Sequence, residues 1–367
     1  MNQIATAAQF RQTESQLPVA WYFDERRHQL EMERLFAAGP GYVGHELMVP
    51  ELNDYLALDW CGGAQALVRG PRGLGLVSNI CRHRQAIMLK GRGNRKTITC
   101  PIHRWTYDLE GKLLGAPHFP EKPCLDLRQT SLASWQGLLF SGPREVSADL
   151  AGMALPTELD FRDFVFDRAI VHECKYNWKT FIEVYLEDYH VQPFHPGLGH
   201  FVTCNDLQWQ FGSWWSLQSV GLNPRFERPG SPVYERWHDA VRGVYGPDLP
   251  GRGAVWMTYF PNLMVEWYPH VLVISTLYPR GIHDTTNVVE FYYPRAIAER
   301  HRDFIEAEQA AYMETAIEDD EIAERMDAGR MALLSAGRNE VGPYQSPMED
   351  GMRHFHEFLR RELGDQR

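Results

Sequence analysis

Hydrophobic residues recur with helical spacing in three stretches of the chain. In the first, 22–37, apolar positions such as Leu30 and Leu35 lie among charged residues. The second runs from 296 to about 334 without a proline, and the third covers 348–363. Spacing of this kind places the apolar side chains on one face of a helix. We therefore predict an N-terminal helix, one long helix and a final amphipathic helix.

The stretches between these helices have the pattern of strands. From about 41 to 142, short apolar runs alternate with Gly and Pro. Two hairpins are predicted there, one around the Gly-Pro-Arg-Gly turn within 66–80 and one at Glu110–Gly111. A strand-like segment (165–178) and a helix-like one (179–189) then precede several long apolar strands. This order predicts an α+β protein in which a small all-β unit precedes an antiparallel sheet framed by helices.

Composition and charge narrow the classes of partner. The chain has 367 residues, enough for two domains, with 44% hydrophobic residues and a formal net charge of −11. A chain this acidic offers no basic surface to a phosphate backbone, so we expect no nucleic-acid partner. No apolar run approaches the roughly 20 residues that span a bilayer, and the first residues lack the pattern of a secretory signal. We expect no membrane partner and a cytoplasmic location.

Two of the six cysteines lie in matching loops with histidines. One residue separates Cys81 from His83, two separate Cys100 from His103, and sixteen lie between the pairs. Two thiolates and two imidazoles are the ligands of a Rieske [2Fe-2S] cluster, in which each kind holds one iron. A zinc ion accepts the same set, but the spacing of the first pair is tighter than in most zinc ribbons. We assign ordinary packing to the other four cysteines, which are Cys61, Cys124, Cys174 and Cys204.

A second group of metal-binding residue types surrounds His190. Glu187 and His190 are three residues apart and share one helix face if the helix-like segment continues to that point. Pro193 is expected to end this helix and to let His195 swing back beside His190. Two imidazoles that converge in this way suit a 2-His-1-carboxylate site for Fe(II), which leaves coordination positions open for dioxygen.

The third ligand of such a site is expected to be a carboxylate of the long helix. The mostly apolar stripe of this helix has a gap between Thr315 and Ile322, which either Glu318 or Asp319 fills. A carboxylate in an apolar stripe is costly unless it is paired, and iron would pair with it. Asp320 lies about 100° further around the helix and is expected to be solvated. Spacing alone does not choose between Glu318 and Asp319.

Together the motifs resemble those of Rieske non-heme iron oxygenase α-subunits, the family of aromatic-ring-hydroxylating dioxygenases and carnitine monooxygenase. The resemblance rests on C-x-H-x16-C-x2-H, on N-W-K at 177–179 and on E-D-Y-H at 187–190 followed by His195. It implies an N-terminal all-β Rieske domain and a C-terminal catalytic domain of helix-grip fold, an antiparallel sheet around a long helix. The implied domains are an N-terminal helical segment (1–40) packed on the catalytic domain, the Rieske domain (41–143) and the catalytic domain (144–367).

The resemblance also implies roles for the candidate residues. The cluster ligands would be Cys81, His83, Cys100 and His103, and the iron ligands His190, His195 and Asp319. In the family, electrons cross from the cluster of one subunit to the iron of its neighbour through a bridging carboxylate. That position maps to Glu187, with Asp188 as the alternative; many members have Asp there, and Glu occurs in members similar to carnitine monooxygenase. Glu183, one turn earlier, is either a supporting acid of the iron site or a surface residue.

The implied function is that of a terminal oxygenase acting on a small organic substrate with O2. A separate reductase of flavin or ferredoxin type would supply electrons from NAD(P)H, and a homotrimer is expected. The substrate would be an aromatic ring or an N-methyl or quaternary ammonium compound, in a pocket to which Trp214, Tyr259 and Trp267 are candidate contributors. Two alternatives remain, a Rieske electron-transfer protein and a helix-grip ligand-binding protein without oxygenase activity.

Overall fold

The computed structural model describes residues 16–223 and 228–364, and the chain forms two compact units. One unit runs from Pro40 to Val146. The other combines the described residues up to Gly39 with those from Ser147 onwards. Each unit has a hydrophobic core of its own. The smaller unit is therefore inserted, in sequence, between two segments of the larger unit.

The smaller unit consists of short antiparallel strands. They are β1 (Tyr42–His45), β2 (Asp54–Ala57), β3 (Gln65–Gly70), β4 (Gly73–Ser78), β5 (Arg92–Asn94), β6 (Thr97–Thr99), β7 (Thr106–Asp108), β8 (Leu113–Gly115), β9 (Gln129–Thr130), β10 (Ala133–Trp135) and β11 (Leu138–Phe140). They form three sheets, in the orders β1-β11-β10, β5-β2-β3-β4-β9 and β6-β7-β8. Single-turn 3₁₀ helices follow β1 and β2, at Glu46–Met48 and Asp59–Cys61. The prediction of an all-β unit is confirmed.

Both predicted hairpins of this unit are present. Strands β3 and β4 pair up to Gly70 and Gly73, so the turn is Gly-Pro-Arg-Gly. The turn between β7 and β8 contains Gly111 at φ +82°, a conformation that glycine adopts without the clash a Cβ atom would cause. The turn residues read from the sequence therefore set the pairing of these strands.

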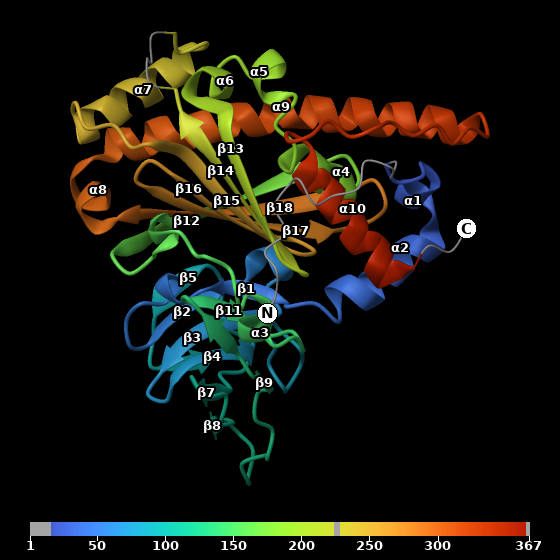
Figure 1. Ribbon diagram of the computed structural model, residues 1–367. Coiled ribbons are helices and arrows are strands. Elements are labelled where there is room, and N and C mark those ends of the chain that lie inside the picture. Colours follow the sequence, from blue (N-terminus) through green and yellow to red (C-terminus); the bar gives the residue numbers. More distant parts are fainter. Residues whose placement is uncertain (1–15, 224–227, 365–367) are drawn as a thin grey trace. The chain divides into compact units, whose positions relative to one another are not determined.

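The larger unit is built on one antiparallel sheet of seven strands (Figure 1). The strands are β12 (Phe164–Cys174), β13 (Val202–Phe211), β14 (Trp215–Leu222), β15 (Arg252–Tyr259), β16 (Leu263–Tyr268), β17 (Val271–Pro279) and β18 (Thr285–Pro294). Their order is β12-β18-β17-β16-β15-β14-β13. Apart from the first strand, sequence neighbours pair with each other, which confirms the predicted antiparallel sheet.

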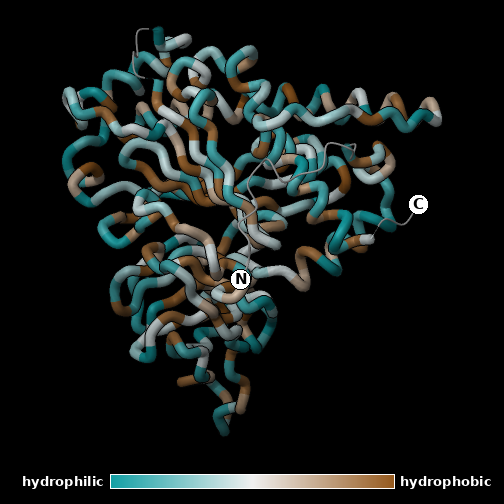
Figure 2. The backbone as a smooth tube through the Cα atoms, viewed as in Figure 1, coloured by the Kyte–Doolittle hydropathy of each residue, from teal (hydrophilic) through white to brown (hydrophobic). Residues whose placement is uncertain are grey.

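One face of this sheet is covered by helices. Side chains alternate between the faces along each strand, so paired residues on neighbouring strands share a face. The paired residues Trp256, Glu266, Val273 and Phe291 form one such row. Three members of the row pack in the same core as Phe304 of the long helix. Hydrophobic segments are frequent along these strands in Figure 2, where the long helix alternates between hydrophilic and hydrophobic residues.

The helices of the larger unit vary widely in length. They are α1 (Ala20–Phe23), α2 (Glu25–Glu31), α3 (Val146–Asp149, whose first residue ends the smaller unit), α4 (Trp178–Tyr185), α5 (Val191–Phe194), α6 (Leu198–Phe201), α7 (Pro232–Tyr245), α8 (Arg295–Arg300), α9 (Arg302–Ser335) and α10 (Asp350–Leu363), with a π-helical turn at Met32–Phe36 and a 3₁₀ turn at Thr157–Leu159. Helix α9 crosses the covered face of the sheet, and its second half extends past the strands (Figure 1). Among the helices of the described ranges, none has both the length and the apolar character that a membrane span requires.

Two predicted helices are divided. The long helix does not begin at 296, because His301 has a non-helical backbone and separates α8 from α9. Helix α8 packs on β12 and β18, whereas α9 packs on α7 and α4, so the chain has to turn between them. The helix expected at 22–37 is interrupted at Asp24, whose extended backbone and side-chain bond to the N–H of Arg27 start a new helix there.

A buried ion pair ties the N-terminal segment to α4. The Lys179 ammonium lies 2.8 Å from one carboxylate oxygen of Glu31 and 2.9 Å from the other, and the Trp178 indole donates to the same carboxylate at 2.9 Å. Both charged residues are inaccessible to solvent. A buried pair with this number of contacts fixes the position of α4, and therefore of the segment that follows it.

Glu183 of α4 belongs to a second interior network. It accepts a hydrogen bond from the Tyr22 hydroxyl, lies 2.7 Å from a ring nitrogen of His356 and pairs with Arg330 at 2.5 Å. It is fully buried, so it is not a surface acid. None of these contacts involves His190 or His195. Glu183 therefore joins α1, α4, α9 and α10 and does not contact those histidines.

Candidate metal centres and substrate pocket

The segment between α4 and α5 brings two histidines together in a way that the helical pattern did not predict. Helix α4 ends at Tyr185, so Glu187 and His190 lie in a turn and not on one helix. The Glu187 carboxylate accepts hydrogen bonds from the backbone N–H groups of Tyr189 (2.7 Å) and His190 (3.1 Å), which stabilises this turn. Pro193 does not end a helix. It lies in the first turn of α5, where its missing N–H is not needed.

Three potential metal ligands converge after this turn. The Nε2 atoms of His190 and His195 are 3.0 Å apart. One carboxylate oxygen of Asp319, on α9, lies 3.0 Å from Nε2 of His195 and 3.4 Å from Nε2 of His190. All three donor atoms lie within 4.8 Å of one another. The structure therefore brings together the two histidines and the one carboxylate expected from the sequence.

The outer contacts of these rings show what the shared space can hold. Nδ1 of His190 bonds to the Glu187 carboxylate, and Nδ1 of His195 lies 2.7 Å from Glu318. A carboxylate accepts only, so each Nδ1 carries the proton and each Nε2 presents a lone pair. Two lone pairs and an anionic oxygen of Asp319 then face one another. This arrangement needs a cation, and its donor set is the one typical of non-heme Fe(II).

The electrostatics of the site show the same demand for positive charge, which a proton can also meet. Burial opposes the charged form of His190, but the carboxylates of Asp319 and Glu187 outweigh it and raise the pKa of His190 to about 10. Burial likewise opposes the ionised form of Asp319, but the two imidazoles hold the pKa of its carboxyl group below the ordinary value. The three side chains therefore favour a positive charge between them.

The neighbouring acids of α9 have different contacts. Glu318 orients His195, as described above. Asp320 accepts from the Tyr176 hydroxyl at 2.8 Å and lies 2.8 Å from Nε2 of His172. The expectation that Asp320 is solvated was wrong, because β12 and the residues before α4 pack against its side of the helix. Geometry separates the three candidates, and only Asp319 faces both His190 and His195.

His172, Cys174 and Asp320 form a second group whose donor atoms lie within 4.8 Å of one another. Both carboxylate oxygens of Asp320 already bond to His172 and Tyr176. Burial raises the pKa of the Cys174 thiol to about 12, so it stays protonated. This group is a hydrogen-bonded cluster beside the first, without the lone-pair conflict that indicates a metal ion.

Asp188 points away from the histidines. Its carboxylate accepts from the Gln218 amide at 2.5 Å, and burial raises the pKa of Asp188 to about 7. Glu187, in contrast, bonds to the His190 ring itself. Of the two carboxylates considered for the bridging position, Glu187 is therefore the one in contact with a candidate iron ligand.

In the smaller unit, two loops of the same backbone geometry present the other four candidates. In each loop the cysteine carbonyl accepts from the residue four positions later, Gln85 or Arg104, both of which have positive φ. The cysteine N–H donates to the carbonyl one residue further on. Equivalent loops present equivalent side chains, so Cys81 and Cys100 occupy matching positions, as they would in a symmetric ligand set.

The donors of these loops fit a cluster larger than one ion. Cys81 and Cys100 are buried, the rings of His83 and His103 lie 4.6 Å apart, and the buried Nδ1 of His83 has no hydrogen-bond partner. No three of the four donor atoms lie within 4.8 Å of one another, although the structure describes all four residues. A single zinc ion would require that closeness, and a two-iron cluster would not. Trp105 stacks on His83 with 6° between the rings and covers this side of the site.

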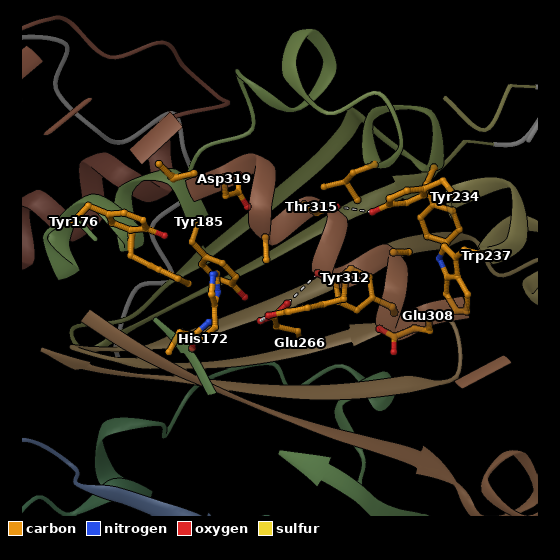
Figure 3. A pocket seen from close by; sticks show the side chains of 18 residues that line it. His172, Tyr176, Tyr185, Tyr234, Trp237, Glu266, Glu308, Tyr312, Thr315 and Asp319 are labelled. Carbon is orange, nitrogen blue, oxygen red and sulfur yellow. Dashed lines mark hydrogen bonds between the residues drawn. The ribbon is translucent and has the colours of Figure 1, made fainter. Parts of the chain in front are cut away.

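A pocket in the larger unit opens beside Asp319 (Figure 3). It encloses about 80 Å³, several times the roughly 10–15 Å³ that one water molecule needs on the same measure. Its walls come from α4, α6, α7, α9 and the covered face of the sheet. The lining residues are His172, Tyr176, Phe181, Val184, Tyr185, Leu198, Phe201, Tyr234, Trp237, Glu266, Tyr268, Asn287, Glu308, Ala311, Tyr312, Thr315, Ala316 and Asp319. The pocket is therefore mostly aromatic and apolar, with few polar groups.

The three aromatic residues suggested from the sequence do not line this pocket. Glu266 and Tyr268 point into it, so Trp267 between them points to the opposite face of the sheet. Tyr259 is three residues from Trp256, which lies in the covered row, and so also faces away. Trp214 packs against Phe358 of α10. A shift of one residue along a strand changes the face, and the sequence pattern did not settle that register.

Comparison with known proteins adds independent information. Residues 161–365 match the family model of the ring hydroxylating alpha subunit (catalytic domain), and residues 41–135 match that of the Rieske [2Fe-2S] domain. The putrescine 2-hydroxylase of Ralstonia nicotianae is 61% identical over 361 residues, which is 98% of this chain and 99% of that protein. The putrescine 2-hydroxylase of Bordetella bronchiseptica is 55% identical over 380 residues, 100% of this chain and 88% of that protein.

Among solved structures, a quaternary ammonium Rieske monooxygenase in complex with an inhibitor is similar to this chain. The TM-score is 0.76 at 22% sequence identity, and the match covers 97% of each chain. At this identity the likeness concerns the fold. It agrees with an all-β N-terminal unit followed by an antiparallel sheet around a long helix.

Proposed function

This chain belongs to the Rieske oxygenases with a ring-hydroxylating α-subunit, and on that premise we propose that it hydroxylates a short aliphatic diamine of the putrescine type. The protein is an enzyme, and its cofactors are a [2Fe-2S] cluster and a mononuclear iron. The observation that supports the diamine is the 61% identity to a putrescine 2-hydroxylase over nearly the whole of both chains. A ring and a quaternary ammonium compound were the substrates considered from the sequence, and a primary diamine was not among them.

We assign the iron to His190, His195 and Asp319, and the cluster to Cys81, His83, Cys100 and His103. The facing lone pairs of the two histidines support the first assignment, and the matched loops support the second. When bound, these groups supply dioxygen activation and electron storage, which no side chain provides. Glu187 and Glu318 hold the two imidazoles in the tautomer that presents Nε2.

The overall reaction balances with one oxygen atom in the product. Dioxygen, a C–H bond, two electrons and two protons give an alcohol and one water. The role of the chain is to bind the diamine in the aromatic pocket, to hold one methylene group beside Asp319, and to keep bulk water out.

Electron supply and assembly belong to the same proposal. A reductase of flavin or ferredoxin type delivers electrons from NAD(P)H, and three chains form a ring in which Glu187 links the iron of one subunit to the cluster of the next. The contact between Glu187 and His190 supports this role, with Asp188 turned towards Gln218. We also propose domain limits at 40/41 and 143/144, and a cytoplasmic location, which the lack of a disulfide bond among the six described cysteines supports.

The two alternatives without oxygenase activity explain less. A pure electron carrier has no use for the converging His190, His195 and Asp319, and a simple binding protein has no use for the cluster loops. The relatives described above are hydroxylases, and the catalytic family model spans residues 161–365.

Product analysis tests the proposal. Holoenzyme with a reductase, NAD(P)H and ¹⁸O₂ is given putrescine, carnitine, choline or naphthalene in parallel. We expect one ¹⁸O atom in 2-hydroxyputrescine, identified by mass spectrometry, and no product with His190→Ala. Labelled product from a quaternary amine or a ring, with none from putrescine, would refute the diamine.

A further inference from the structure

Two acidic side chains, Glu266 and Glu308, lie inside the pocket. Glu266 of β16 is 1% exposed and Glu308 of α9 is 3% exposed. Among the described residues (16–223 and 228–364), none of those that line the pocket is Lys or Arg. His172 is the one histidine among them, and it is already paired with Asp320. Acidic side chains are rarely this buried unless they are paired with a cation or a metal ion.

The partners of both acids are neutral hydroxyl groups. The Tyr268 hydroxyl donates to one oxygen of Glu266 at 2.9 Å, and the Tyr312 hydroxyl approaches the other at 3.3 Å. The Tyr293 hydroxyl donates to Glu308 at 2.5 Å. Such contacts hold the carboxylates in place without neutralising their charge. Burial accordingly raises the pKa of each acid to about 8, and the proximity of Glu266 adds to the effect on Glu308.

The position of the acids along the pocket is set by α9. Glu308 precedes Tyr312 by one turn, about 6 Å of helix, and Asp319 follows Tyr312 by seven residues, about 10 Å. Tyr312 contacts Glu266. In Figure 3, Asp319 and Glu308 lie towards opposite ends, with Tyr312 and Glu266 between them. A ligand held at the acids therefore extends along the helix towards the candidate iron ligands.

The space between is suited to a methylene chain. Tyr268 and Tyr312 are edge to face, with ring centroids 6.3 Å apart, and Tyr185 and Ala311 also line the pocket. Aromatic faces pack against methylene groups and attract an ammonium group through their quadrupoles. The pocket thus combines an apolar middle with an end at which two carboxyl groups can pair with a cation.

We propose that Glu266 and Glu308 bind the ammonium group of the substrate that is remote from the hydroxylated carbon, and so select ligands with a second cationic end. This inference deepens the proposed function and rests on it in taking the ligand to be a diamine. The acids are specificity determinants that position a methylene group beside His190, His195 and Asp319 without contacting the reacting atoms.

Equilibrium binding tests the inference without turnover. Anaerobic holoenzyme is titrated calorimetrically with putrescine and with butane-1,4-diol, in which hydroxyl groups replace both ammonium groups and leave none for the two acids. We expect the wild-type protein to prefer putrescine by about ten- to one-hundredfold, the range for a hydrogen bond to a charged group. In Glu266→Gln and in Glu308→Gln this preference falls towards one.

The sheet offers a matched control. Glu290 is equally buried and accepts from Tyr292 two residues later at 2.7 Å, as Glu266 does from Tyr268, but it lies on the opposite face of the sheet from Phe291. Glu290→Gln keeps the wild-type preference. Equal affinities of the wild-type protein for the two ligands, or an unchanged preference in both pocket variants, would overturn the inference. The comparison of the two ligands uses only the wild-type protein, so it holds even if a variant fails to fold.

The outcomes also separate this inference from the proposed function. If putrescine bound tightly in a carboxylate-dependent way but was not hydroxylated, the ammonium site would stand and the proposed reaction would be refuted. Hydroxylation of putrescine without any binding preference over the diol would support the reaction and refute the ammonium site.

Discussion

The Glu318 carboxylate lies 2.7 Å from Nδ1 of His195, on the side of the ring opposite to Asp319. Consecutive residues of one helix therefore contact the two nitrogens of the same imidazole. The first sets the tautomer of the ring, and the second shares with it the space assigned to iron. This relationship makes Glu318 and Asp319 separable by mutation.

Glu318→Ala is expected to lower iron affinity by about ten- to one-hundredfold, since the His195 ring loses the acceptor that orients it. Iron content after dialysis against a graded chelator measures the change. Glu321 lies one helical turn after Glu318 and is an exposed acid paired with Arg325, so Glu321→Ala should leave the iron affinity unchanged. Equal losses in the two variants would mean that only the overall charge of the helix matters.

Asp319→Ala should abolish mononuclear iron binding and leave the [2Fe-2S] cluster in place, because the two groups use separate residues. Metal analysis and the visible absorption of the cluster report the two contents independently. Asp320→Asn should keep the iron, as its contacts are His172 and Tyr176. Loss of iron in Asp320→Asn with retention in Asp319→Ala would reverse the assignment.

Glu187→Gln should leave the [2Fe-2S] cluster in place and slow turnover by at least about tenfold. Gln retains an acceptor for the N–H groups of Tyr189 and His190, so the turn persists while the charge is lost. Steady-state kcat with saturating reductase is the measurement. A greater loss of kcat in Asp188→Asn than in Glu187→Gln would move the bridging role to Asp188.

Putrescine binding should tighten as the pH rises from about 6.5 to 8.5. The pKa of Glu266 and that of Glu308 are each raised to about 8, so a cation has to displace protons below that pH. For one group this gives up to about tenfold in affinity per pH unit. Calorimetry at several pH values measures the slope, which Glu266→Gln should reduce. The other titratable groups facing the two acids are Tyr268, Tyr293, Tyr312, Asp167 and Asp319.

The same shifts have a consequence for stability with the opposite sign. Each carboxyl group binds its proton more strongly in the folded than in the unfolded chain, whose pKa is near 4.5. The contribution of these groups to stability is thus present below about pH 4.5 and is lost as the pH rises through 8. Putrescine should raise the melting temperature more at pH 8.5 than at pH 6.5. A pH-independent shift would contradict the buried acids as its binding site.

Lys179→Met should lower the free energy of unfolding of the larger unit by about 3–5 kcal/mol, since it leaves Glu31 buried and unpaired. Urea titration followed by tryptophan fluorescence measures this. The double variant with Glu31→Gln should regain most of the loss. If the double variant stayed as unstable as Lys179→Met, the loss of stability would come from the packing of the Lys179 side chain and not from the unpaired charge of Glu31.

The candidate histidine and cysteine ligands could be predicted from the sequence because the spacing within each pair is local. Cys81 and His83 lie in one short loop, and His190 and His195 flank the single helical turn of α5, so the donors of each pair stay close whatever surrounds them. The reason given for His190 was nevertheless wrong in detail. Glu187 stabilises a turn by accepting from backbone N–H groups, whereas a continuous helix was expected.

The pocket lining was harder to predict from the sequence, because it depends on the register of long strands. Trp267 was a candidate, but its neighbours Glu266 and Tyr268 face the cavity. Glu266 is the one acid in the apolar strand 263–268, and Glu308 falls on the same side of α9 as Asp319, eleven residues later, but neither residue was considered from the sequence. Neither signal indicates an amine site until the sheet and helix are packed together.

Helix α9 carries Glu308, Ala311, Tyr312 and Thr315 along the pocket and Asp319 at its end. A single replacement in the earlier turns alters which molecule fits, while the metal-binding turn keeps its place. Inserting one residue before Asp319 would instead rotate the two groups apart by about 100° and uncouple them. Point substitutions in this helix can therefore change which ligand fits the pocket, whereas an insertion or deletion would separate the pocket from the candidate iron ligands.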